Sequence, residues 1–579
     1  MSENKNLIVA IGLSLSILFG FQYFYEGSKP KPAPVIIKES ITAAPVPLPA
    51  QSNAEVLVPA QPLTREQSLA LHKRVPVKTP KVTGSINLVG ARLDDLSLKL
   101  YRETADPKSP EIILLSPEQS KDAYFVEFGW LGTAKFPDSK SIWTIQGPQA
   151  ELTPTQPVTL TWKNGEGLKF ERTINVDENY LFTVTDRVTS DAQADIQLKA
   201  YSQVTRIGKP TTSGYYILHE GAIGVINGRL NEVDYDKLFK ENAIQQTTTG
   251  GWLGFTDKYW LVALIPNQKT AAHTTFSGQE KGGIFRCHIE YDGQTLKPGQ
   301  TLEQTQYAFT GAKVLSLLDG YEEKLGFNRF DLAVDFGWFY FLTKPLFYIL
   351  EFFHQLLGNL GLAILLLTVL VKILFFPLAN KSFKSMARMK ILGPKMELIK
   401  QRYAHDKARM NQELMDFYRR EKVNPVSGCL PMLIQAPIFF CLYKVFFVTI
   451  EMRHAPFYGW IHDLSSPDPT SVFNLFGLIP WTPPSVLMIG LWPLLMGITM
   501  ILQQRLSPQP ADPVQAKMML IMPVMFTYLF ASFPAGLVIY WAWSNMLTIS
   551  QQVLITRRAE KQSLVEIIPP KRKPSKTKL

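Results

Sequence analysis

A single lysine interrupts one of the most apolar stretches of this chain. Lys372 lies in LTVLVKILFFPL (367–378), where the only other polar residue is Thr368. A charge near the centre of a bilayer costs about 2.5–3.5 kcal/mol on insertion scales. The ammonium must therefore either reach the interface along its flexible stem or meet polar groups inside the protein.

Polar side chains in other apolar segments favour the second possibility. Thr368 lies one helical turn before Lys372 on the same face. Gln435 stands between two prolines, which lack backbone donors. The last apolar segment adds Trp541, Ser544 and Asn545. Taken singly, each could simply bond one helix to another. Taken together, they predict a wetted cavity that opens toward the cytoplasm and has Lys372 as its fixed charge.

Six apolar segments come close to the length that crosses about 30 Å of hydrocarbon as a helix. The first, Leu7–Tyr25, is followed by no small-residue cleavage site, which favours an uncleaved anchor (1–26) over a signal peptide. The other five are Leu360–Leu378, Cys429–Ile450, Ser485–Leu502, Met518–Phe533 and Gly536–Ile555. The aromatic segment 332–358 carries Lys344, Glu351 and His354, and we expect it to lie in the membrane interface.

Residues 83–331 have the pattern of an all-β domain. In IFRCHIEY, Phe285, Cys287, Ile289 and Tyr291 alternate with polar residues, which is the period of a half-buried strand. LKFERTINV and LFTVTDRV repeat this pattern between turn signals. So many alternating strands predict two packed sheets. The Pro-rich segment 27–82 before them is predicted to be a linker.

The distribution of charge predicts an orientation in the membrane. Basic residues outnumber acidic ones in the loop 381–423 and in the tail 557–579, whereas Asp and Glu slightly outnumber Lys and Arg in 26–335. The positive-inside rule places the loop and the tail in the cytoplasm. With six spans the N-terminus is then cytoplasmic too, and the β domain is periplasmic. A second intramembrane cation, Lys444, lies close to Glu451 near the outer end of its segment, where pairing or snorkelling would account for it.

The basic loop contains two helical patterns, broken at Gly393–Pro394 and near Ala404–Asp406. Apolar residues recur at helical spacing in both. They predict either a packed hairpin with a solvated basic face, or a Met-rich surface that contacts hydrophobic segments and ribosomal RNA. The candidate contact residues are Met386, Arg388, Met389, Lys390, Arg402, Met410 and Phe417. Anionic lipids and RNA are the candidate partners of the tail.

Several kinds of site find no support in the sequence. The three cysteines, Cys287, Cys429 and Cys441, have no CxxC spacing, which argues against a disulfide framework and against a zinc site. No GxxxxGK[ST] phosphate loop occurs. The polar residues of the β region form no recognisable catalytic cluster. We therefore expect no metal and no other cofactor.

Three stretches resemble the YidC/Oxa/Alb family of membrane protein insertases in its long Gram-negative form. They are EKVNPVSGCLPMLIQAPIFFCLY, APFYGWIHDLSSPDP and FPAGLVIYWAWSNMLTISQQ. GGWLGFTDKYWLVALIP (250–266) adds a looser likeness in the β region. The resemblance covers nearly the whole chain. It implies a periplasmic β-supersandwich and a five-helix core (359–556) around a hydrophilic groove that is open to the cytoplasm and to lipid.

The resemblance also implies roles for individual residues. The family's groove charge is usually an arginine, and the matching residue here is Lys372, which keeps the charge but loses the bidentate fork. The other matching groove positions are Thr368, Gln435, Tyr540, Trp541, Ser544 and Asn545. Nascent membrane proteins, the Sec translocon and the ribosome are the implied partners, with no small-molecule substrate.

We therefore expect an insertase of the bacterial inner membrane, not an enzyme. A secondary transporter or channel would also use an intramembrane charge, but such proteins usually show internal repeats, and none is visible. A carbohydrate-binding or sugar-processing β domain on a membrane anchor is the second alternative. The missing catalytic cluster weighs against it.

Overall fold

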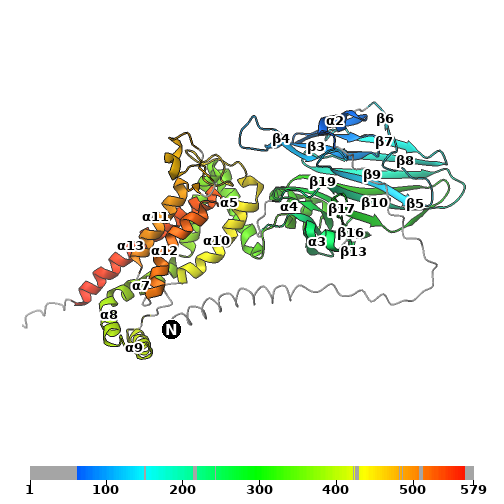
Figure 1. Cartoon of the computed structure of the whole chain (residues 1–579). Coiled ribbons are helices and arrows are strands. Elements are labelled where there is room, and N and C mark those ends of the chain that lie inside the picture. The colour runs from blue at the N-terminus through cyan, green and yellow to red at the C-terminus, as the bar shows by residue number, and fades with distance from the viewer. Residues whose placement is uncertain are drawn as a thin grey trace, which may run out of the picture. The chain divides into compact units, whose positions relative to one another are not determined.

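A computed structural model describes residues 62–148, 151–212, 218–241, 243–421, 423, 430–481, 483–484, 487–507 and 513–567 of the chain. The predicted anchor Leu7–Tyr25, most of the linker 27–82 and the tail beyond residue 567 lie outside these residues. The described residues form a β domain followed by a helical region (Figure 1).

One sheet of the β domain contains most of its early strands. These are β1 (Arg74–Lys78), β2 (Val82–Asn87), β3 (Arg92–Arg102), β4 (Glu111–Leu115), β5 (Tyr124–Gly132), β10 (Ile196–Ile207), β13 (Ala243–Thr249), β16 (Ala271–Gln279), β17 (Ile284–Tyr291) and β18 (Gln294–Leu296). Their order is β1-β2-β3-β5-β10-β17-β16-β13, with β4 beside β3 and β18 beside β10. The paired strands run antiparallel.

The second sheet is also antiparallel. Its strands are β6 (Thr144–Gln146), β7 (Val158–Lys163), β8 (Leu168–Val176), β9 (Leu181–Ser190), β11 (Gly221–Ile226), β12 (Arg229–Val233), β14 (Trp252–Thr256), β15 (Trp260–Ile265) and β19 (Thr301–Ala312). They follow the order β12-β11-β14-β15-β19-β9-β8-β7-β6. The buried residues of both sheets form one hydrophobic core, which confirms the predicted sandwich.

Alternation along the strands decides which side chains enter this core. In β17, Phe285, Cys287, Ile289 and Tyr291 are all buried, as the sequence predicts. In β8 the same alternation places a charged residue in the core, because Arg172 occupies an inward-facing position and is fully buried. Its guanidinium donates from Nε and Nη2 to the two carboxylate oxygens of Asp186, at 2.6 and 2.8 Å. This bidentate pairing is what makes a buried charge tolerable between two sheets.

Short helices flank the sheets, and a longer one follows the domain. They are α2 (Arg65–Ala70), α3 (Tyr235–Glu241), α4 (Leu315–Leu325), the 3-10 helix η1 (Phe330–Ala333) and α5 (Tyr340–Leu357). The segment 332–358, predicted to be an interfacial helix, is thus helical from Tyr340 onward. Gly358 ends α5 in the left-handed region (φ 66°), a conformation that glycine adopts without a steric penalty.

The helical region continues with α6 (Leu360–Leu374), α7 (Phe376–Ile391), α8 (Gly393–Arg402), α9 (Lys407–Arg420), α10 (Leu430–Val448), η3 (Ile450–Met452), η4 (Val472–Gly477), α11 (Leu491–Leu506), α12 (Pro513–Phe530) and α13 (Ala535–Ile567). In Figure 1, α8 and α9 lie at one end of the bundle formed by the other helices. Asn359 caps α6 by accepting from the backbone N–H of Leu362 at 3.1 Å, and Asp406 caps α9 in the same way.

The apolar segment predicted to be one helix over Leu360–Leu378 is two helices. The chain bends by 68° between α6 and α7, and the break falls at Phe375. Pro377 explains the position of the break, because proline has no N–H to bond the carbonyl of Ile373 and its ring clashes with that carbonyl, whereas proline is tolerated in the first turn of a new helix. The prediction was wrong because it followed hydrophobicity through the proline.

Within the described part of the chain, no helix taken alone has both the length and the hydropathy of a membrane span. The bent pair of α6 and α7 meets that standard when its two helices are taken together. Gln435–Val448 and Ala516–Phe530 are apolar helices of shorter length.

Candidate functional site

The ammonium of Lys372 lies where α6, α10 and α13 meet. Its Nζ donates to Oε1 of Gln435 at 3.2 Å and to Oγ1 of Thr548 at 2.9 Å. The side chain therefore binds polar groups inside the helical region, which is the second of the two possibilities raised by the sequence. The contact between Lys372 and Gln435 joins two residues predicted to share a site.

The network continues from Gln435 to the last helix. The amide Nε2 of Gln435 donates to the hydroxyl of Tyr540. Ser544 lies one turn further along α13, and its carbonyl accepts from Oγ1 of Thr548 at 2.7 Å. Tyr540 and Ser544 are both buried. Gln435 therefore accepts a hydrogen bond from the ammonium through Oε1 and donates one to the phenol through Nε2, which fixes the orientation of its amide.

A small hollow of about 40 Å³ adjoins the ammonium. Its walls come from α6, α7, α10 and α13 and consist of Val371, Lys372, Phe375, Leu378, Ala379, Phe383, Gln435, Ile438, Thr548 and Gln551. Among these described lining residues, Lys372 is the only charged one. A cavity of this size with several polar walls can hold water. The hollow therefore combines one charge with polar walls from Gln435, Thr548 and Gln551.

Three predicted groove residues point elsewhere. Thr368 is buried and donates to the carbonyl of Ile364 in its own helix at 2.7 Å. Asn545 donates to Oγ1 of Thr499 in α11 at 3.1 Å. Trp541 packs against aromatic rings, with centroids 4.7 Å from Phe439, 4.9 Å from Phe530 and 6.1 Å from Phe526. Thr368 and Asn545 stabilise helix geometry and helix packing, and Trp541 joins α13 to α10 and α12.

Two residues of the site are not among the predicted groove residues. Thr548 contacts the ammonium directly, and Gln551 lines the hollow. Thr548 follows Ser544 by four residues and Tyr540 by eight, so the three share one face of α13. That spacing was the available signal.

Lys444 pairs with a carboxylate other than the nearby Glu451, whose proximity was the basis for expecting either pairing or snorkelling. Its Nζ binds Oδ2 of Asp335 at 2.9 Å, and Asp335 precedes α5 by five residues. Glu451 is close in sequence, but it lies beyond the end of α10 in η3. The partner comes from a distant part of the sequence, so proximity along the chain could not reveal it.

The basic loop forms a packed helical hairpin. Its core is made of Met389, Leu392, Met396, Ile399, Met410, Leu414, Phe417 and Tyr418. Met386 packs instead with Phe383 and with Ile555 of α13. The Met-rich stripes thus lie mostly inside the described structure, which agrees with the first of the two interpretations of this loop.

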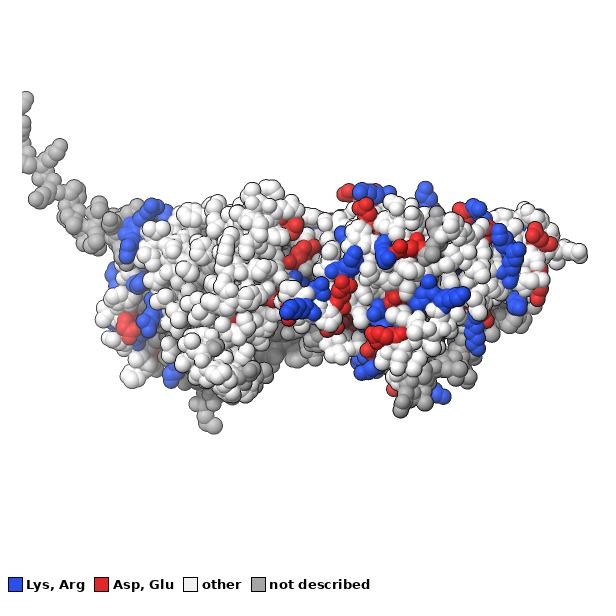
Figure 2. Space-filling model, turned by 90° about the horizontal axis from the view of Figure 1, so that it is seen from above, with Lys and Arg blue, Asp and Glu red and all other residues white. Residues whose placement is uncertain are grey.

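The outer face of the hairpin is basic. Arg388, Lys390 and Arg402 are exposed. Figure 2 shows Lys and Arg gathered at one end of the helical region, whose remaining visible face is nearly free of charge. Over the β domain, acidic and basic residues are interspersed (Figure 2). The exposed Lys and Arg side chains at this end would therefore attract any anionic partner of the helical region.

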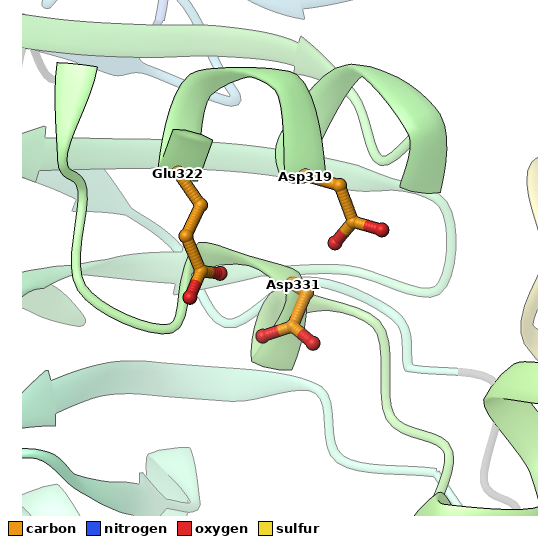
Figure 3. A group of neighbouring side chains, drawn as sticks. All are labelled: Asp319, Glu322 and Asp331. Carbon is orange, nitrogen blue, oxygen red and sulfur yellow. The ribbon is translucent and has the colours of Figure 1, made fainter. Parts of the chain in front are cut away.

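Three carboxylates at the end of the β domain come close enough together to hold a cation. Asp319 and Glu322 project from α4 toward Asp331 of η1 (Figure 3), and one oxygen of each lies within 4.8 Å of the others. Lys344 of α5 already binds two of them, with Nζ 2.9 Å from Asp319 and 2.6 Å from Asp331. Burial alone would lower the pKa of Lys344, but these hydrogen bonds outweigh it and raise the pKa. The cluster therefore ties α5 to the β domain.

Comparison with protein families gives two matches that together cover most of the chain. Residues 74–349 match the family described as "YidC periplasmic domain". Residues 352–562 match the family described as "60Kd inner membrane protein". The boundary between the two matches falls within α5, close to the point where the β domain gives way to the helical region.

Curated relatives share about half of their residues with this chain. The membrane protein insertase YidC of Methylobacterium nodulans is 50% identical over 537 residues, which cover 90% of this chain and 88% of the relative. The protein of the same name from Rhizobium meliloti is 46% identical over 572 residues, covering 96% of each. A solved structure of an active YidC insertase covers 83% of this chain and 92% of its own, at 19% identity and a TM-score of 0.34, which is too weak a similarity to place any residue.

Proposed function

Because the chain belongs to the YidC family of membrane protein insertases, we propose that Lys372 and its polar partners receive the hydrophilic flank of an incoming protein segment. The protein is an insertase of the inner membrane and not an enzyme, so its work is to move a segment between environments. The observation that carries the proposal is the ammonium held between Gln435 and Thr548 beside a hollow.

The proposed mechanism separates the polar and the apolar parts of the client. The hydrophobic segment slides along the lipid-facing sides of α10 and α13, where Phe440, Met546 and Leu554 are exposed. A polar side chain of its short flank reaches the hollow, which has room for only a few water molecules, so that less hydrocarbon remains to be crossed. Partition of the segment into lipid then drives insertion, at about 0.8 kcal/mol for each buried CH₂ group.

Lys372 contributes a positive field in this mechanism. An ammonium is a point charge with three rotatable donors, so it can exchange Gln435 or Thr548 for an acidic group of the client without a fixed bidentate geometry. Tyr540 holds the amide of Gln435 in place during that exchange. The residues Thr368, Trp541, Ser544 and Asn545 position the helices that surround the hollow.

We further propose the topology that places these parts. Six spans put both termini, the hairpin 381–423 and the tail 557–579 in the cytoplasm, and the β domain in the periplasm. The exposed basic residues of the hairpin, with the tail, would receive nascent chains and ribosomes and would contact anionic lipids. Cooperation with the Sec translocon belongs to the same proposal.

A complementation series tests the role of Lys372. Cells depleted of their own insertase receive Lys372→Arg, Lys372→Ala or Lys372→Glu, and insertion of a short-tailed client is scored by protease accessibility. We expect Arg to support insertion and Ala and Glu to fail at normal protein levels. Full insertion with Ala would show that the charge is dispensable and would refute the proposed role.

A further inference from the structure

An apolar protrusion lies between α10 and α11. It consists of Phe473, Leu475, Phe476, Leu478, Ile479 and Trp481, all of which expose more than a third of their surface, and we call these six residues the apolar tip. Leu478 is 83% exposed, which is more than most lipid-facing side chains of α12. Contiguous exposed apolar residues of this kind mark an interaction surface and not a solvated loop.

Hydrogen bonds close the base of the protrusion. Asp468 is buried and accepts hydrogen bonds from the indole Nε1 of Trp460 at 3.0 Å and from the backbone N–H of Trp492 at 2.9 Å. Trp492 is in the first turn of α11, so the carboxylate also complements the positive end of that helix. The N–H of Val472 donates to the carbonyl of Ile489 at 3.1 Å, which closes the two sides of the protrusion against each other.

The backbone of the tip is held in a conformation that turns its side chains outward. Leu475 and Phe476 have φ values of 49° and 58°, in the left-handed region that bulky residues rarely adopt. The N–H of Phe476 donates to Ser471 at 2.8 Å, and the N–H of Ile479 donates to Asn474 at 3.0 Å. Such conformations persist where the surrounding structure imposes them, often at sites that bind a partner.

The sequence around the tip argues against a charged partner and against exposure of the tip to water. No charged residue occurs between Asp468 and Arg505, a stretch that includes the whole protrusion and nearly all of α11. The exposed apolar surface continues along α11 through Leu495, Ile498 and Leu502. An aromatic ring such as that of Trp481, beside prolines and aliphatic side chains, is typical of protein that lies at the level of lipid headgroups and upper acyl chains.

We propose that the apolar tip inserts into the periplasmic leaflet of the membrane and so anchors the insertase beside its helical core. The inference rests on the proposed topology, which puts the connection between α10 and α11 on the periplasmic side. The occupant of this surface is then the acyl-chain region of lipid. The test must distinguish this occupant from the alternative, which is a hydrophobic surface of a second protein.

Depth-dependent quenching in the full-length protein tests this proposal. A cysteine-free background (Cys287→Ala, Cys429→Ala, Cys441→Ala) that still supports insertion is given Leu478→Cys and labelled with the environment-sensitive fluorophore NBD. The protein is reconstituted alone into liposomes that contain lipids spin-labelled on the acyl chain. Two matched variants accompany it. Leu520→Cys on α12 is 72% exposed, and Ile142→Cys in the β domain is 70% exposed.

We expect the Leu478→Cys label to emit at shorter wavelength and to be quenched about threefold more than the Ile142→Cys label, and to a degree comparable to the Leu520→Cys label. Quenching no greater than that of Ile142→Cys, with Leu520→Cys strongly quenched, would overturn the inference and leave the proposed topology intact. A blue-shifted label that lipid spin labels do not quench would overturn it in favour of a protein partner. Failure to quench Leu520→Cys would refute the proposed membrane placement of the helices together with the inference.

Discussion

Replacing Lys372 with methionine should separate stability from insertion. Methionine has a similar length and no charge, so the substitution removes the ammonium and its hydrogen bonds to Gln435 and Thr548 while still filling the space. If Lys372 were only a structural residue, loss of these bonds would weaken the helical region and insertion would fall as a consequence. If the charge acts on clients, insertion should fall with the fold almost unchanged.

The structure gives the size of both effects. Each of the two charge-assisted hydrogen bonds contributes about 1.5–3 kcal/mol, whereas removing a charge from an apolar helix relieves about 2.5–3.5 kcal/mol. The two bonds together contribute about 3–6 kcal/mol, so the contributions partly offset each other, and the free energy of unfolding should fall by about 1.5 kcal/mol at the middle of these ranges and by no more than about 3.5 kcal/mol. A client carboxylate about 5 Å from the ammonium gains about 1.7 kcal/mol at an effective dielectric constant of about 40, which corresponds to a tenfold to twentyfold change in rate.

Reconstituted insertion with a matched pair of clients measures this difference. One client carries an aspartate in its polar flank, and the other carries an asparagine at the same position. For Lys372→Met we expect the aspartate client to insert about tenfold to twentyfold more slowly and the asparagine client to lose no more than about twofold. Lys372→Arg should restore the aspartate client. An equal loss for both clients, or a wild-type rate with the aspartate client, would refute the reasoning.

Three further outcomes follow from charges of the β domain and of α5. Arg172→Met leaves the carboxylate of Asp186 buried without its partner, and it should reduce the free energy of unfolding by about 3–5 kcal/mol in urea unfolding of the full-length protein in detergent. Adding Asp186→Leu should recover most of the lost stability, and no recovery would contradict the pairing. Lys344→Met should loosen α5, seen as faster hydrogen exchange in its first turns, and millimolar Ca²⁺ should leave the wild-type exchange unchanged because the ammonium already occupies the carboxylates. His288, whose Nε2 lies 3.8 Å from the carboxylate, and Lys199, which donates to it, lower the pKa of Glu290 to about 2. The stability that Glu290 contributes is therefore present above about pH 4.5 and is lost as the pH falls toward 2. Glu290→Gln should remove this pH dependence, about 1 kcal/mol after solvent screening, and an unchanged pH profile would argue against it.

The β domain was predictable because its signal is local. Residues such as Phe285 and Cys287 alternate with polar neighbours, and burial on one face of a strand requires only that period. The order of the strands was not predictable. The pairing of β10 with β17, for example, joins Val204 to Cys287, and no property of either segment alone selects that partner.

The candidate site was predictable in its composition but not in its geometry. A lysine and a glutamine in apolar helices must find partners, and they found each other. Which further side chains meet them depends on how each helix is rotated about its axis. That rotation brings Thr548 to the ammonium and turns Asn545 toward α11, although both residues lie on the same helix. Hydrophobic periodicity cannot fix it, because α13 is apolar on several faces.

Family membership also decides between the function classes that the residues left open. A transporter or channel would explain Lys372, and a sugar-processing module would explain the β domain. Relatives that are about half identical over nearly the whole chain are insertases, and they contain both parts together. The residues alone could not make that choice, because an intramembrane charge serves several kinds of membrane protein.

Because of the 68° break at Phe375, α7 is a separate helix that contacts two different parts of the helical region. Its first turns supply Leu378, Ala379 and Phe383 to the wall of the hollow beside Lys372, and its last turns supply Met389 to the core of the basic hairpin. A partner that pulls on the hairpin therefore pulls on the same rigid rod that bounds the hollow. Because the helix is interrupted at Phe375, a change in the direction of α7 would not require α6, which holds the charge, to bend. On the proposed function, docking of a nascent chain on the hairpin would therefore also change the width of the space offered to its polar flank.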